Sequence, residues 1–184
     1  MKQINTNVSS IKAAESRTKP LWAKKQIAQA AVELLKEKDP EAISISELCE
    51  KAGVGRASFY RHYQNLDDVL MKETLPVFES WKERALAGEY PTMSALIESL
   101  LKIMLDKKDL FKVLTKRNRL SVLKNVLMEL FGPDPDNDPV TAYSKAYVAY
   151  MFYGFVETWL QRGMKEDPEE LAAHFPGGSN AAEI

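Results

Sequence analysis

The chain has little of what several protein classes require. It holds a single cysteine, Cys49, among 184 residues, and one thiol supplies neither an internal disulfide nor a multi-cysteine zinc site. No apolar run approaches the ~20 residues of a membrane-spanning helix, and residues 1–20 lack the apolar stretch of a secretory signal. These absences predict a cytoplasmic protein with no membrane partner.

The charge that is present is unevenly distributed along the chain. The net charge is -1, with 25 basic and 26 acidic residues, yet residues 1–25 carry six basic side chains and one acidic side chain. Residues 76–184 carry 13 basic and 16 acidic side chains. This asymmetry indicates an anionic partner for the N-terminal region. A merely solvated, disordered arm remains the alternative explanation.

Apolar residues recur only at helical spacing, which predicts an all-α fold. We expect a flexible basic arm over 1–19, a helix-turn-helix domain over 20–75, a helical domain over 76–175 and a loose tail over 176–184. The expected helices span about 20–38, 44–52, 56–63, 66–87, 92–106, 109–117, 119–131 and 139–164, with a last short helix starting at Pro168.

Two of these helices have unusual sequences. Pro76 lies inside the 66–87 helix, where it removes a backbone hydrogen bond and predicts a kink or a split. The 139–164 helix is apolar on nearly every side between Val140 and Leu160. Such a helix is covered on more than one side, so we expect its own domain on one side and a second subunit on the other.

The most informative segment runs from Ile43 to Tyr63. Ser44 followed by Glu47 is a capping-box pattern that starts a helix, and Gly53 is a typical left-handed residue that ends it. A second short helix then begins near Arg56. Helix, glycine turn and short helix together predict a helix-turn-helix, whose second helix enters the major groove of DNA.

The second short helix divides into two faces. Phe59 and Tyr63 are expected to face the core, which leaves the remaining side chains for DNA. Arginine can bond guanine O6 and N7 together, a small alanine permits close approach, and hydroxyls and imidazole can reach phosphates. The candidate DNA-binding residues are Ser44, Arg56, Ala57, Ser58, Tyr60, Arg61 and His62, with Lys24 and Lys25 on the preceding helix.

Residues 20–75 resemble the DNA-binding domain of the tetracycline-repressor (TetR) family of bacterial regulators. The resemblance depends on Ser44-Ile45, Leu48, Ala52-Gly53-Val54, Arg56-Ala57-Ser58-Phe59-Tyr60, His62-Tyr63 and Asn65-Leu66-Asp67-Asp68-Val69-Leu70. It implies that Arg56 and Ala57 face bases, while Ser44, Tyr60 and His62 face phosphates. Ser58 also matches a family DNA-contacting position.

Two positions depart from the family pattern. Gly55 stands where serine or threonine is frequent, which weakens the cap of the recognition helix. Leu66 stands where lysine is frequent, so charge for a phosphate contact would come from Lys24, Lys25 and the arm instead.

The resemblance further implies a homodimer that binds a near-palindromic operator, a double-stranded DNA site. A small-molecule effector, of unknown identity, would bind the C-terminal domain, shift the 66–87 helix and release the DNA, as in a repressor. Control by a partner protein, or no effector at all, remains an alternative. A small helical-bundle enzyme is a remote one, because no nucleophile–base pair or paired carboxylates can be placed.

Residues 91–184 resemble the family's C-terminal domain in being helical, and Trp159, Gly163-Met164 and Pro168-Glu169-Glu170-Leu171 are similar to endings common in this family. We expect effector contacts from Met104, Tyr147, Tyr150, Phe155, Glu157 and Trp159. We expect dimer contacts from Ala142, Ala146, Ala149, Tyr153, Val156 and Leu160.

No metal or cofactor is expected. Asp134, Asp136 and Asp138 have the spacing of a calcium loop, but Pro139 and Lys145 stand where that loop needs glycine and glutamate.

Overall fold

The structure, a computed structural model, describes residues 4–174, with side chains from Leu21 onward. Between Ile4 and His174 the secondary structure is entirely helical. The α-helices are α1 (Ile4–Glu37), α2 (Ile45–Ala52), α3 (Arg56–His62), α4 (Leu66–Leu86), α5 (Met93–Leu105), α6 (Lys108–Lys116), α7 (Leu120–Phe131), α8 (Pro139–Gln161) and α9 (Pro168–Ala173). A short 3₁₀ helix, Pro40–Ala42, joins α1 to α2.

The chain divides between Val69 and Leu70 into two compact units. This boundary lies inside the first turns of α4, slightly before the boundary at residue 75 that the sequence predicted. The tail expected over 176–184 lies outside the described residues. None of the helices between residues 4 and 174 is long and apolar enough to cross a membrane.

Helix α1 begins at Ile4, which corrects the expected helix start near residue 20. Residues 4–19 contain neither proline nor glycine. Once a helix has nucleated, each further residue adds a hydrogen bond without repeating the nucleation cost. The helix can therefore extend toward the N-terminus, and Pro20 removes only one of its bonds.

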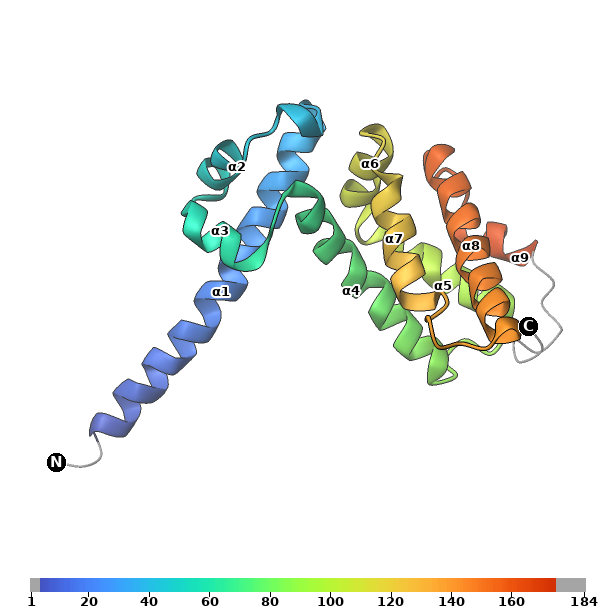
Figure 1. Cartoon of the computed structure of the whole chain (residues 1–184), viewed down its shortest axis with the longest axis horizontal. Helices are drawn as coiled ribbons and strands as arrows, with labels where there is room; N and C mark the ends of the chain where they lie inside the picture. Colours follow the sequence, from blue (N-terminus) through green and yellow to red (C-terminus); the bar gives the residue numbers. More distant parts are fainter. Residues whose placement is uncertain (1–3, 175–184) are drawn as a thin grey trace. The chain divides into compact units, whose positions relative to one another are not determined.

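In the first unit, α1 contacts both α2 and α3 (Figure 1). Its core is a continuous apolar cluster in which Ile27, Leu35, Leu48 and Phe59 have no exposed surface. Two ion pairs connect α1 to α2 at the surface, Lys38 with Glu47 and Lys51 with Glu33. A three-helix unit of this kind holds α3 in a fixed place on the surface of the unit.

In the second unit, α7 lies beside α8 and α5 lies beside α9 (Figure 1). An aromatic cluster fills its core: the Trp81 ring packs edge-on against Phe131 and Phe152, and Phe78 packs edge-on against Phe111. The Trp81 indole N–H donates a hydrogen bond to Ser99 Oγ at 3.0 Å. Helix α4 thus contributes the aromatic side chains around which this unit is built.

Helix α8 has one buried face and one exposed face. The buried face comprises Ala149, Phe152, Val156, Trp159 and Leu160. The opposite face exposes large apolar side chains at Val140, Tyr143, Tyr147 and Tyr150. We call these four residues the α8 stripe.

Three predicted dimer contacts are corrected by this arrangement. Ala149 and Val156 have no exposed surface and Leu160 only 2%, so they pack inside their own domain and leave nothing for a partner to contact. Ala142, Ala146 and Tyr153 are half-buried at its margin. Half of the predicted dimer contacts therefore belong to the core.

Candidate DNA-binding site and effector groove

The turn before α3 is built as the sequence predicts. Ser44 Oγ accepts the Glu47 N–H at 3.1 Å and caps α2. Gly53 ends α2 with φ of 65°, in the left-handed region that glycine adopts without strain. Its N–H bonds back to the Glu50 carbonyl. The chain then enters α3 through Gly55, which provides no side-chain cap.

Helix α3 separates a buried face from an exposed one, as predicted. Phe59 is fully buried and Tyr63 is 3% exposed, and their ring centroids lie 5.8 Å apart. These two side chains fix the rotation of the helix about its own axis. The outward residues are Arg56, Ala57, Tyr60 and Arg61, with Ser58 and His62 half-buried at the margins.

The exposed face of α3 carries positive charge and no carboxylate. Arg56 and Arg61 are both exposed, and the Tyr60 ring, 54% exposed, packs edge-on against Phe59 with centroids 5.3 Å apart. Burial raises the pKa of the Cys49 thiol behind this helix, and the Arg56 charge offsets part of that rise. The face can offer guanidinium and hydroxyl groups to a polyanion.

The other candidate DNA contacts lie in the same compact unit. Ser44 is exposed at the start of α2, and Lys24 and Lys25 are exposed on α1. Leu66 is 8% exposed and belongs to the core, so its apolar side chain has a structural role. Leu21 and Trp22, on the same helix, are 72% and 54% exposed, and no sequence motif marks this pair.

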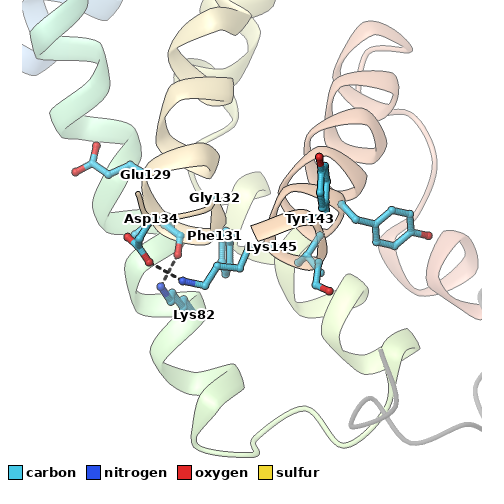
Figure 2. A pocket seen from close by; sticks show the side chains of 11 residues that line it. Lys82, Glu129, Phe131, Gly132, Asp134, Tyr143 and Lys145 are labelled. Atoms are coloured by element: carbon cyan, nitrogen blue, oxygen red, sulfur yellow. Dashed lines mark hydrogen bonds and ion pairs between the residues drawn. The ribbon is translucent and has the colours of Figure 1, made fainter. Parts of the chain in front are cut away.

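The second unit contains an open groove of about 740 Å³ between α4, the end of α7 and the start of α8. Figure 2 shows Lys82, Asp134 and Lys145 converging at one end of it. The residues around the groove are Lys82, Glu129, Leu130, Phe131, Gly132, Asp134, Tyr143, Ser144, Lys145, Tyr147 and Val148.

The groove differs from the effector site that the sequence predicted. Of the expected residues, only Tyr147 lines it. Met104 is fully buried and Trp159 is 2% exposed, so both serve as core. Phe155 and Trp159 border a smaller space of about 180 Å³ between α8 and α9.

Two further expected effector residues already have partners. Glu157 accepts the Tyr153 hydroxyl at 2.7 Å on its own helix. The Lys124 ammonium lies 5.3 Å from the centre of the half-exposed Tyr150 ring. Because the Glu157 carboxylate already accepts a hydrogen bond from Tyr153, its presence on α8 does not require a bound ligand.

The loop after α7 is held close to that helix. A Cβ at Gly132 would lie 2.3 Å from the Met128 carbonyl oxygen, so only glycine fits there. Asp134 and Asn137 close a turn through two hydrogen bonds, and the Asp138 carboxylate caps α8. Among the described residues, no group of His, Cys, Asp and Glu side chains could hold a metal ion.

A three-helix unit with a fixed turn between α2 and α3, and with exposed basic residues on α3, defines a helix-turn-helix DNA-binding transcription regulator. Comparison with protein families agrees. Residues 27–71 match the family described as bacterial regulatory proteins, tetR family, and residues 92–176 match a transcriptional regulator C-terminal region. The chain belongs to the TetR family of transcription regulators.

Solved structures share this fold at low sequence identity. A TetR transcriptional regulator from Streptococcus agalactiae is 21% identical, with a TM-score of 0.57, over 88% of this chain and 96% of the other. Lin0861 from Listeria innocua is 18% identical with a TM-score of 0.61 over 85% and 87%.

A third solved structure is NalD from Pseudomonas aeruginosa, the secondary repressor of a multidrug efflux pump. It is 20% identical with a TM-score of 0.51 over 87% of this chain and 93% of its own. No curated protein sequence matches the chain.

Proposed function

We propose that this protein is a ligand-responsive regulator, acting as a repressor, that binds a near-palindromic operator as a homodimer. A small molecule in the C-terminal unit releases the DNA. The observation that carries the proposal is the exposed face of α3, where Arg56, Tyr60 and Arg61 lie outward. On the opposite face, Phe59 and Tyr63 are buried in the core of the unit. A packed helix that exposes arginines without carboxylates is suited to a nucleic acid.

The roles within the DNA-binding site follow from side-chain chemistry. Arg56 and the small Ala57, at the start of α3, read base edges in the major groove. Ser44, Ser58, Tyr60 and His62 bond phosphates and fix the register. Arg61, Lys24 and Lys25 add the charge that makes binding sensitive to salt.

Dimerisation is assigned to the α8 stripe. Val140, Tyr143, Tyr147 and Tyr150 are 50–79% exposed and follow one another at spacings of three or four residues. Aromatic side chains are enriched in the cores of protein interfaces. A second copy with the same stripe completes a two-fold interface. The two recognition helices of the dimer would then reach half-sites about 34–36 Å apart.

Effector control is assigned to α4, because this helix belongs to both units. Leu66 and Val69 lie in the core of the first unit, and Phe78 and Trp81 lie in the core of the second. Pro76 lies between these pairs, at a point where the helix lacks one backbone hydrogen bond. A ligand that binds the DNA-incompetent state more tightly would shift the population toward it.

Control by a partner protein, without a small molecule, remains a second candidate. It is favoured by the dense packing of Met104 and Trp159 at the positions expected to line a ligand cavity. The 740 Å³ groove favours the small molecule, since its volume matches the ~300–1,000 Å³ of typical ligand sites.

The test begins with selection of operator sequences from a random duplex pool by the full-length protein. Arg56→Ala should then cost roughly 1–3 kcal/mol on the selected DNA and relax the preference at one base pair. Tyr60→Phe should weaken binding to all sequences without changing preference. Fluorescence anisotropy on selected and random duplexes measures both variants, with Lys102→Ala on α5 as the control.

An equal loss for Arg56→Ala on selected and random DNA would contradict the base-reading role. A changed sequence preference for Tyr60→Phe would contradict the phosphate role.

A further inference from the structure

Two lysines interrupt the apolar stripes that face the core of the second unit. Lys82 follows the fully buried Phe78 by four residues on α4, and Lys145 precedes the fully buried Ala149 by four residues on α8. Residues four apart lie on the same helix face. Each lysine is half-buried, so both charges lie at the rim of the core rather than on the outer faces of their helices.

Lys145 pairs with the carboxylate of Asp134, and Lys82 lies close by on α4 (Figure 2). Lys145 Nζ lies 2.6 Å from Asp134 Oδ2. Lys82 donates a hydrogen bond to the Leu130 carbonyl, and its ammonium lies 5.2 Å from the centre of the Phe131 ring. Both lysine charges lower the pKa of Asp134, with the bonded Lys145 as the larger influence. Asp134 therefore occupies a position that stabilises negative charge.

The anionic group of a ligand can displace the Asp134 carboxylate from Lys145 without moving the helix ends. The Asp134 side chain is 68% exposed, and an exposed ion pair contributes little net stability because water and salt screen it. The helix ends on either side are fixed independently of this pair, by the close approach of Gly132 to Met128 and by the Asp138 cap of α8. Loss of the Asp134–Lys145 contact would leave both helix ends in place.

Beside the charged end, the groove is lined mainly by aromatic and apolar side chains, with the Ser144 hydroxyl and the Glu129 carboxylate also on its border. Phe131, Tyr143, Tyr147 and Val148 line it, and the Phe131 ring continues into the core against Trp81 and Phe152. A site with a cationic end and an aromatic wall fits a molecule with one anionic group and an apolar body.

We propose that the groove binds a small amphipathic anion whose carboxylate or phosphate replaces Asp134 beside Lys145 and Lys82. Its apolar part lies against Phe131 and Val148. This proposal rests on the proposed ligand-responsive function and names the class of effector and its binding site. In the free protein, Asp134 takes the place of the ligand's anionic group.

A purely structural role of the same residues predicts a different mutational pattern. If the lysines only fasten the loop over 132–138, then removing Lys145 or Asp134 should disturb the groove in the same direction. If Asp134 competes with a ligand, the two substitutions should act in opposite directions. The sign of the Asp134 effect therefore separates the two explanations.

The experiment measures binding of 2-naphthoate to the full-length protein without DNA, by isothermal titration calorimetry. Lys145→Met should weaken binding at least tenfold, and Asp134→Asn should tighten it severalfold because the internal competitor is removed. Lys102→Met, which removes an exposed, ion-paired lysine on α5, should leave binding unchanged. Lys82→Met should weaken binding, and Lys82→Arg preserves the charge if the methionine variant fails to fold.

Matched probes test the charge requirement. 2-Naphthylmethanol and 2-naphthylmethylammonium have the same aromatic body and should bind at least tenfold more weakly than 2-naphthoate, whereas 2-naphthyl phosphate distinguishes a preference for phosphate over carboxylate. Weaker binding by Asp134→Asn, equal binding of the neutral alcohol, or no binding of either anion at millimolar concentration would each overturn the proposal.

The outcome is separable from the test of DNA binding. Arg56→Ala should bind 2-naphthoate as the unchanged protein does, because Arg56 belongs to the other unit. Intact operator binding without naphthoate binding would refute the anion site and leave the DNA-binding role standing. Naphthoate binding without operator binding would refute the DNA-binding role and leave the anion site standing.

Discussion

Helices α3 and α8 both expose tyrosines, but the residues beside those tyrosines differ. On α3, Tyr60 lies among two exposed arginines, Arg56 and Arg61. On α8, the exposed tyrosines belong to the apolar α8 stripe, Val140, Tyr143, Tyr147 and Tyr150. The same side chain can thus present a hydroxyl to a phosphate in one place and a ring to another protein in the other.

The difference shows how neighbouring residues determine what an exposed aromatic residue does. A tyrosine beside guanidinium groups lies in a positive field that attracts a polyanion. A row of tyrosines with no charged side chain among them forms a patch that favours burial against a partner.

The largest expected effect comes from the buried side of α3. Phe59→Ala should lower the free energy of unfolding by roughly 3–5 kcal/mol, because it empties a fully buried aromatic site. Thermal and urea denaturation measure this. The adjacent Tyr60→Ala, on the exposed side, should change stability by only about 0.5 kcal/mol while weakening operator binding. Similar stability losses for both would mean that α3 has no free face.

A smaller but clear effect is expected on the α8 stripe. Tyr147→Glu places a charge in the middle of the stripe and should raise the dimer dissociation constant at least tenfold, about 1.4 kcal/mol or more. Analytical ultracentrifugation measures the change. Lys108→Glu on the exposed side of α6 serves as the control. An unchanged dimer with Tyr147→Glu would remove the stripe from the interface.

Replacing Pro76 in α4 should affect the coupling between effector binding and operator binding. Pro76→Ala restores a backbone N–H inside the helix, so α4 should bend less easily. We expect a severalfold change in operator affinity or in its response to the effector, measured by anisotropy with and without ligand. If both quantities stay the same, Pro76 has only a packing role.

The smallest effect concerns a single proton on α8. Burial and the hydrogen bond to Glu157 raise the pKa of Tyr153 to about 12, above its ordinary 10. As the pH rises from 10 to 12, the unfolded chain loses this proton first, so the contribution of Tyr153 to stability is lost over that range. Ultraviolet titration should show a late-ionising tyrosine that Tyr153→Phe removes and Glu157→Gln shifts to lower pH.

The DNA-binding unit could be predicted from the sequence because its signals are local. Ser44, Gly53 and the Phe59–Tyr63 pair act within a few residues of their own positions, and each lies where the pattern indicated. The extent of α1 could not be predicted, because whether a polar segment stays helical depends on a helix that nucleates further along the chain.

The groove could not be predicted because its residues are distant in sequence. Lys82, Asp134 and Lys145 come from one helix, a loop and another helix, and their convergence depends on how α4, α7 and α8 pack. The faces of α8 were also ambiguous, since Ala149 and Tyr147 are both compatible with burial in an apolar helix. One sequence signal for the groove was available. Lys145 lies four residues before Ala149 and so interrupts an apolar face of the helix.

The close contact at Gly132 restricts how this protein can evolve. Any larger residue there would push the backbone away from the Met128 carbonyl, so one end of the groove tolerates no variation. The wall formed by Ser144 and Val148, which lie outside the α8 stripe, has no such limit. In a laboratory selection for response to a new inducer, we therefore expect substitutions to accumulate on that wall while position 132 stays unchanged.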